Sequence, residues 1–176
     1  FLSSPGDVPY ERRLVRSIVE GLGYSDSLRE RVTLEVVSWD DPDSPAAMFL
    51  SMPPQQAIDL GLSRPADCDI VLIIFWSKLG SPLDFDGQHY ESGTHFEMMD
   101  GVRAAEANGG YPPFVLFYKK TEPVTITLDD PNRSAKTEQF DRLNAFLKGD
   151  FFLADSGRRF LRGTHSYASI DQFRRD

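Results

Sequence analysis

The sequence predicts an α/β domain built on an open parallel sheet of about five strands, with helices on both faces. Strand-like and helix-like segments alternate along the chain, which is typical of a parallel sheet covered on each side. Residues 70–76 form a continuous apolar run of strand length, as a central strand buried on both faces requires. A length of 176 residues, 40% of them hydrophobic, suits one folded domain.

Residues 1–4 are predicted to form the first strand. Asp7 is placed to cap the helix that follows, and Pro9 fits the first turn of that helix. Gly21 and Gly23 are expected to end it. The apolar face of this helix repeats with helical spacing and consists of Leu14, Val15, Ile18, Val19 and Leu22.

The next part of the chain contains two more strands, separated by a long loop. Residues 32–39 are rich in β-branched side chains and predict the second strand. Residues 40–54 contain four prolines and three aspartates and predict a long loop, with a short helix over 55–62. Residues 69–76 predict the third strand, which is the central one.

The remaining segments continue the alternation. Residues 77–91 predict a second long loop, and Ser92 is expected to cap a helix over residues 92–108. Residues 114–118 predict the fourth strand, residues 159–161 an edge strand, and a final helix ends the chain. A further helix precedes the edge strand, and its apolar face consists of Phe140, Leu143, Phe146 and Leu147.

Two regions follow from this pattern. Residues 1–150 are expected to form the main domain, and residues 151–176 a strand and helix that complete it and lead to a further domain. The chain begins within a predicted strand, without Met, and ends within a predicted helix, so we expect it to be part of a longer protein. Five arginines and two aspartates give residues 157–176 a net charge of +3, which favours docking on that next domain over contact with nucleic acid.

Composition excludes several functional classes. The net charge of −8 would repel phosphate backbones and anionic lipid, so we expect no nucleic-acid or membrane partner. The single cysteine, Cys68, cannot form an internal disulfide and fits a reducing cytoplasm. The three histidines show no metal-binding spacing with Cys68, so neither a metal nor a bound cofactor is expected.

The candidate site lies at the carboxyl edge of the predicted sheet, where open α/β folds bind ligands. Ser3 and Ser4, at the end of the first strand, are candidates for hydroxyl contacts to a ligand, with a purely structural turn as the alternative. Trp39 and Trp76 end neighbouring strands and are either core residues or the walls of a ligand cleft. Ser77, at the start of the following loop, is a further candidate for substrate contact.

Glu97 is the candidate catalytic residue. It lies about five residues into the helix that follows the third strand, at the margin of an apolar stripe that includes Phe96, Met99 and Val102. Gly101 is expected to leave room beside it. A carboxylate there can stabilise the oxocarbenium-like transition state of glycosidic bond cleavage, and Phe96 is the aromatic side chain nearest to it in sequence. The alternative is a glutamate that only interacts favourably with the helix dipole.

Two segments occur in the order and at the separation of a known pair of signatures. The first is Phe1-Leu-Ser-Ser-Pro-Gly-Asp-Val8 followed by Glu11-Arg12, and the second is Asp69 to Gly80 followed by Ser92-Gly-Thr-His-Phe-Glu97. In these segments the chain resembles the Toll/interleukin-1 receptor-like (TIR-like) family, over about residues 1–150. The resemblance implies a flavodoxin-like fold. It also implies a place at the N-terminus of STAND-type signalling NTPases with NACHT modules, in bacteria often anti-phage immune sensors.

The resemblance also implies an activity. Active TIR domains cleave NAD at the nicotinamide–ribose bond with a glutamate on the helix after the third strand, and Glu97 matches that position. This implies an NAD glycohydrolase switched on by self-association of the attached NTPase, with NAD as substrate and not as cofactor. Gly93 stands where such enzymes commonly carry a tryptophan. A non-catalytic interaction adaptor and a nucleoside 2-deoxyribosyltransferase-like N-glycosidase are the alternatives.

Overall fold

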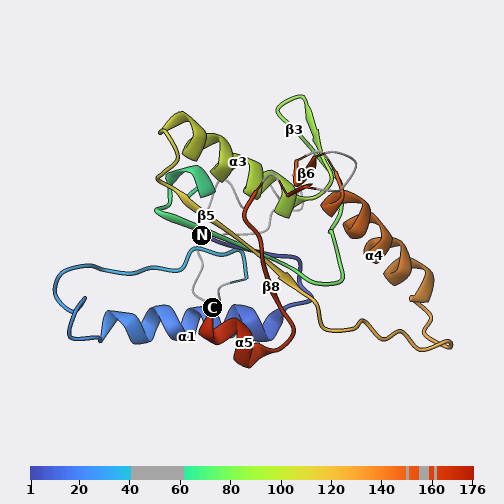
Figure 1. The fold of residues 1–176 in the computed structure, drawn as a ribbon, viewed down its shortest axis with the longest axis horizontal. Helices are drawn as coiled ribbons and strands as arrows, with labels where there is room; N and C mark the ends of the chain where they lie inside the picture. The colour runs from blue at the N-terminus through green and yellow to red at the C-terminus, as the bar shows by residue number, and fades with distance from the viewer. Residues whose placement is uncertain (41–61, 150, 155–158, 161) are drawn as a thin grey trace.

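The centre of the molecule is a four-stranded parallel sheet (Figure 1). This computed structural model describes the whole chain except residues 41–61, 150, 155–158 and 161. The sheet has the order β1-β2-β5-β8. Its strands are β1 (Leu2–Ser3), β2 (Ile70–Phe75), β5 (Phe114–Lys120) and β8 (His165–Tyr167). The predicted α/β class with an open, flavodoxin-like parallel sheet is confirmed, with four strands in place of five.

Helices cover both faces of this sheet, as predicted (Figure 1). α1 (Pro9–Gly23) and α5 (Ile170–Arg175) lie on one face, and α3 (Gly93–Ala107) and α4 (Arg133–Leu147) lie on the other. A short 3-10 helix, η1 (Pro65–Asp67), precedes β2. Among the described residues, no helix is both long enough and apolar enough to cross a bilayer.

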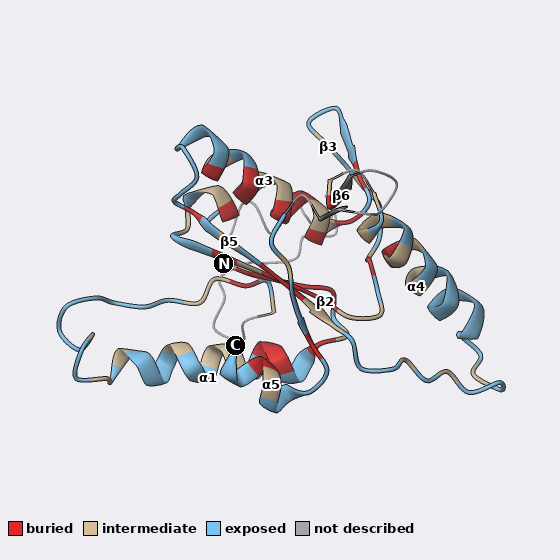
Figure 2. Cartoon of the chain, in the orientation of Figure 1, coloured by how far each residue is buried: buried red, intermediate tan, exposed pale blue. Residues whose placement is uncertain are grey.

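Strand β2 supplies side chains to both cores of the domain (Figure 2). Val71, Ile73 and Phe75 belong to the core under α3 and α4, whereas Leu72 and Ile74 belong to the core over α1 and α5. The first core is completed by Leu79, Met98, Val102, Phe117, Leu143 and Phe152. The second is completed by Leu2, Val8, Tyr118, Tyr167 and Phe173. From Val71 onward the apolar run is therefore covered on both faces, with Leu72 and Trp76 half-buried and the other residues buried.

The prediction of a strand over residues 32–39 is wrong. One backbone hydrogen bond, from Leu2 N to Val37 O (2.9 Å), joins this segment to β1, and residues 32–35 are exposed. β-branched side chains favour a strand only where a neighbouring strand and a core receive them. Here only residues 36–38 are partly or fully buried, so the segment runs beside β1 without extending the sheet.

The predicted loop over residues 77–91 contains a β-hairpin, in which β3 (Leu83–Phe85) pairs antiparallel with β4 (Gln88–Tyr90). Its turn is Asp86-Gly87, with φ angles of 49° and 72°. Aspartate followed by glycine suits such a two-residue turn, since both positions need positive φ. The prediction missed the hairpin because each strand is too short to show a clear alternation of apolar residues.

The C-terminal segment contributes the fourth strand of the sheet. The edge strand predicted at residues 159–161 is present in part as β7 (Arg159–Phe160), but it pairs antiparallel with β6 (Leu153–Ala154), outside the main sheet. β8 takes the edge position beside β5 instead. The predicted final helix is confirmed as α5, where Ser169 Oγ accepts a hydrogen bond from Gln172 N (3.3 Å).

Two predicted elements fall largely on residues that the structure does not describe. Only Asp40 of the predicted loop over 40–54 and only Leu62 of the predicted helix over 55–62 are described. The helices predicted at the start and in the middle of the chain are confirmed as α1 and α3, and the strand predicted over 114–118 is confirmed as β5.

Gly101 sets how closely α3 approaches the sheet. A Cβ at this position would lie 3.1 Å from Val71 Cγ2 and 3.5 Å from Val115 Cγ2. The expected room beside Glu97 is therefore not what this glycine provides. It allows the helix to pack directly against β2 and β5.

Replacing Gly101 with valine should destabilise the domain by about 1–3 kcal/mol, because the added methyl groups would overpack the contact between α3 and the sheet. The matched control is Gly21→Ala in α1, where a Cβ meets nothing within 4 Å and alanine should stabilise the helix by up to about 1 kcal/mol. Urea unfolding of both variants measures the two effects. A Gly101→Val protein as stable as the parent would contradict the close approach.

Candidate functional site

The carboxyl end of β1 brings together two residues selected from the sequence. Ser3 Oγ donates a hydrogen bond to Glu97 Oε2, and both side chains are buried, Glu97 with an exposed fraction of 3%. Ser92 fixes where α3 begins, as predicted, since its Oγ accepts from His95 N (3.1 Å). Glu97 follows in the second turn of that helix. A buried carboxylate and a hydroxyl therefore meet at the edge where open α/β folds bind ligands.

Ser4, the next residue along the chain, contacts the opposite helix layer. Its Oγ accepts a hydrogen bond from Arg12 Nη1 (2.7 Å), in the first turn of α1. Arg12 also engages both carboxylate oxygens of Asp40, with Nε donating to Oδ2 (2.6 Å) and Nη2 donating to Oδ1. Arg16, one turn further along α1, donates to Asp40 Oδ1 and to Ser38 Oγ (2.6 Å). We call these five residues the Arg12 cluster.

The two arginines hold Asp40 in its ionised form. Burial by itself would raise the pKa of Asp40, but the hydrogen bonds and charges of Arg12 and Arg16 outweigh burial and lower this pKa from 3.8 to about 2. Neither Arg12 nor Asp40 was selected as a site residue from the sequence. The available signal was position, because Arg12 lies in the first turn after one predicted strand and Asp40 directly follows another.

Asp7 joins the loops that follow β1 and β2. It was predicted to cap α1, but the N-cap residue is Val8 and makes no side-chain cap bond, so that prediction is wrong. Asp7 Oδ2 instead accepts hydrogen bonds from both N and Oγ of Ser77, at 2.8 Å each. Two donors on the neighbouring loop compete with the helix for this carboxylate. The contact gives Ser77 a role in fixing the edge of the sheet.

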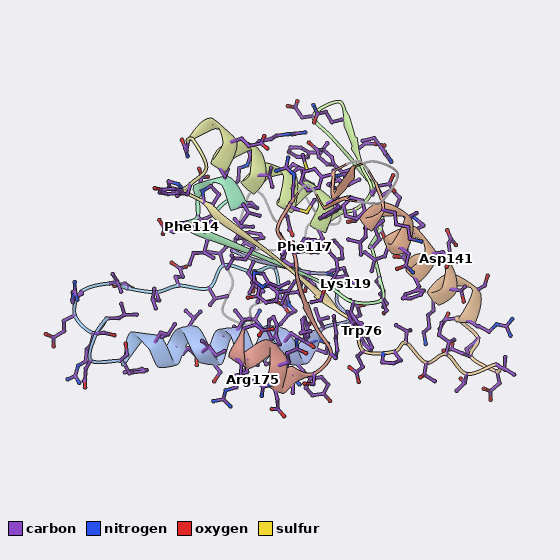
Figure 3. The ribbon with its side chains drawn as sticks, viewed as in Figure 1. Trp76, Phe114, Phe117, Lys119, Asp141 and Arg175 are labelled. Atoms are coloured by element: carbon purple, nitrogen blue, oxygen red, sulfur yellow. The ribbon has the colours of Figure 1, made fainter. Side chains whose placement is uncertain are left out.

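The two tryptophans lie on the α1 side of the sheet but at different places. Trp39 is 36% exposed, and Arg12 Cζ lies 5.4 Å from its ring centroid. Trp76 Nε1 donates to Glu122 O (2.9 Å), and Lys120 Nζ lies 4.4 Å from the Trp76 ring centroid, near the end of β5 (Figure 3). Trp39 therefore borders the Arg12 cluster, whereas Trp76 packs with Lys120.

Phe96 lies beneath the hairpin of β3 and β4. Its ring centroid lies 4.7 Å from that of Phe85 and 5.2 Å from that of Tyr90, and the side chain is buried. These contacts make Phe96 an anchor for the hairpin over the beginning of α3.

Two half-buried lysines at the end of β5 add positive charge to the same edge. Lys119 Nζ donates to Trp76 O, and burial lowers the pKa of Lys119 to about 8. Lys120 Nζ lies 3.0 Å from Oε1 of the buried Glu11 and 2.7 Å from Oε2 of Glu122. Sequence reasoning missed these residues as well, although both lysines directly follow the apolar run of the fourth predicted strand.

A cavity of about 380 Å³ lies elsewhere on the α3 face of the sheet. It is lined by residues of α3 and β5 and by the segment around Arg162, and Glu97 is not among them. Within the described ranges, no group of three or more His, Cys, Asp or Glu side chains is placed to hold a metal ion. The carboxyl edge carries two separate polar contacts. Towards α3, the Glu97 carboxylate accepts a hydrogen bond from Ser3. Towards α1, the Arg12 guanidinium donates to Ser4 and Asp40.

Replacing Asp40 with asparagine should lower the free energy of unfolding by about 1–3 kcal/mol at pH 7, because the charge-assisted bonds to Arg12 are lost. The folded pKa of about 2 lies below the unfolded value of 3.8, so this contribution is complete above about pH 4 and is lost as the pH falls towards 2. The difference between parent and variant should be roughly halved at pH 3. Urea titrations at pH 7 and pH 3 measure it, and a difference that stays constant would contradict the ion pair.

Comparison of the chain with known proteins identifies no family for it. No family model, no curated protein and no solved structure matches the chain.

Proposed function

We propose that this domain cleaves the nicotinamide–ribose bond of NAD at the carboxyl edge of its sheet, with Glu97 as the catalytic carboxylate. The observation that carries the proposal is the hydrogen bond from Ser3 Oγ to Glu97 Oε2, which holds a buried carboxylate at this edge. Open α/β folds bind ligands there. The TIR-like signatures in the sequence support NAD as the substrate.

In this reaction the bond between the nicotinamide nitrogen and the ribose carbon breaks, and its electron pair leaves with nicotinamide. The ribosyl group then carries a positive charge shared with its ring oxygen, and the Glu97 carboxylate stabilises that charge. Water adds to the same carbon and loses a proton, which gives ADP-ribose. Ser3 is a positioning residue, because its hydroxyl fixes one oxygen of Glu97.

The burial of Glu97 supports an activity that depends on assembly. With 3% of its surface exposed, this side chain meets a substrate only after a change at the sheet edge. The isolated domain is therefore inactive in this scheme and becomes active when several copies are clustered. Its setting would be the N-terminus of a larger cytoplasmic immune protein, a STAND-type NTPase that self-associates.

The same burial favours a second function. A buried, hydrogen-bonded carboxylate also serves to tie α3 to β1, which is a purely structural role. In that case the domain is a non-catalytic adaptor that passes on a signal by self-association.

Glu97→Gln should reduce NAD cleavage by about a hundredfold or more in the clustered domain, because the amide is neutral and cannot stabilise the ribosyl cation. The amide oxygen can still accept the Ser3 hydrogen bond, so the fold should be retained. The measurement fuses the domain to an oligomeric scaffold and quantifies nicotinamide released from NAD by chromatography.

Glu106→Gln is the matched control, since it removes the same charge from the far end of α3, where Glu106 is exposed and pairs with Arg162. It should leave cleavage unchanged. Absence of nicotinamide from the clustered parent would overturn the enzyme proposal in favour of the adaptor. Release of free base from nucleosides with NAD untouched would point to a deoxyribosyltransferase-like enzyme.

A further inference from the structure

Two arginines of α1 converge on one carboxylate near the end of β1. Arg12 and Arg16 both donate to Asp40, and Arg12 alone engages both of its oxygens. The Arg12 side chain is 2% exposed, so its surroundings fix the position of the two guanidinium nitrogens that donate to Asp40, here called the guanidinium fork. The buried hydroxyls of Ser4 and Ser38 accept hydrogen bonds from the same two arginines.

This set of groups is also suited to a phosphate. The guanidinium fork presents parallel N–H donors to two oxygens, and it binds carboxylate and phosphate in the same way. Serine hydroxyls can donate to further oxygens. In the free protein the carboxylate of Asp40 therefore occupies a position that two phosphate oxygens of a ligand would fit.

The Arg12 cluster is accessible from solvent at one side. The side chain of Asp40 is 27% exposed and that of Trp39 is 36% exposed, while Arg12 beneath them is buried. A ligand that displaces the Asp40 side chain would meet the Arg12 guanidinium directly. The Trp39 ring over Arg12 adds an aromatic surface beside the anion position.

The Arg12 cluster is linked to Glu97 through two consecutive residues at the end of β1, although α1 and α3 cover opposite faces of the sheet. Ser4 accepts from Arg12 and the preceding residue, Ser3, donates to Glu97. Consecutive Cα atoms are about 3.8 Å apart. One stretch of chain at the end of β1 thus contacts a carboxylate in the α3 layer and a guanidinium group in the α1 layer.

We propose that Arg12, Arg16, Ser4 and Ser38 bind the diphosphate of the dinucleotide substrate, and that Asp40 occupies this anion site in the free protein as an internal competitor. The inference rests on the proposed function for the identity of the dinucleotide. A ligand diphosphate displaces the Asp40 carboxylate from the Arg12 fork. The apparent affinity is then the intrinsic affinity multiplied by the fraction of molecules in which Asp40 has left the site.

Asp40→Asn should increase the affinity for ADP by about tenfold or more, because a neutral amide competes poorly for the guanidinium fork. Adenosine, which lacks the diphosphate, should bind the parent and the variant equally. Adding Arg12→Lys to the variant should remove the gain, since lysine keeps the charge but not the fork. Isothermal titration calorimetry at constant ionic strength measures these affinities with the complete chain.

Asp40→Asn weakens a partly buried ion pair and could leave the variant too unstable for calorimetry. Thermal unfolding is therefore the second measurement. Saturating pyrophosphate should raise the melting temperature of Asp40→Asn more than that of the parent, and should not raise that of the double variant with Arg12→Lys. Sodium chloride of matched ionic strength is the control for screening.

The outcomes separate this inference from the proposed function. An ADP affinity that Asp40→Asn leaves unchanged, or an equal gain for adenosine, would overturn the anion site even if the clustered domain cleaves NAD. A gain for ADP that depends on Arg12 would support the site. If that gain came with no NAD cleavage, the anion site would stand and the proposed catalytic function would fall.

Discussion

The burial of β2 on both faces constrains most of this structure. The backbone groups of such a strand need partners on both sides, and β1 and β5 provide them. Its side chains need cover on both faces, which α1 with α5 and α3 with α4 provide. Because all three pairings in the sheet are parallel, the strands end at one shared edge. The polar residues at the ends of β1 and β2 therefore gather there, with Ser3 ending β1, Ser4 following it, and Ser77 in the loop after β2.

The charged contacts at this edge each join a helix to the end of a strand. Ser3 with Glu97 joins β1 to α3, Ser4 with Arg12 joins β1 to α1, and Lys120 with Glu11 joins β5 to α1. Burial of charged groups carries a large desolvation cost, and apolar side chains of similar volume attach helices at least as well. The concentration of charged groups at the carboxyl edge is therefore not required to attach the helices. The two apolar cores already hold the layers together.

The fold was largely predictable because its main signals are local. The apolar run of β2 identifies a doubly covered strand without any knowledge of its neighbours. Residues 32–39 have the same β-branched character, but a strand also needs a partner along its length, and pairing is not visible in a local window. The meeting of Ser3 with Glu97 followed from topology, because strand ends share an edge. The fork of Arg12 on Asp40 did not, because it depends on side-chain directions between two segments with no common pattern.

The order of charges along the edge distinguishes among the three functions better than the fold, which hosts many activities. In NAD, the diphosphate is attached to the ribose whose anomeric carbon becomes cationic, at the 5′ position of that ribose. The edge presents a carboxylate and a guanidinium fork through consecutive residues, in matching order. A nucleoside would use only the carboxylate, and in an adaptor both groups would have a structural role alone. Of the three functions, the proposed cleavage of NAD is the one that would use both groups to bind a ligand.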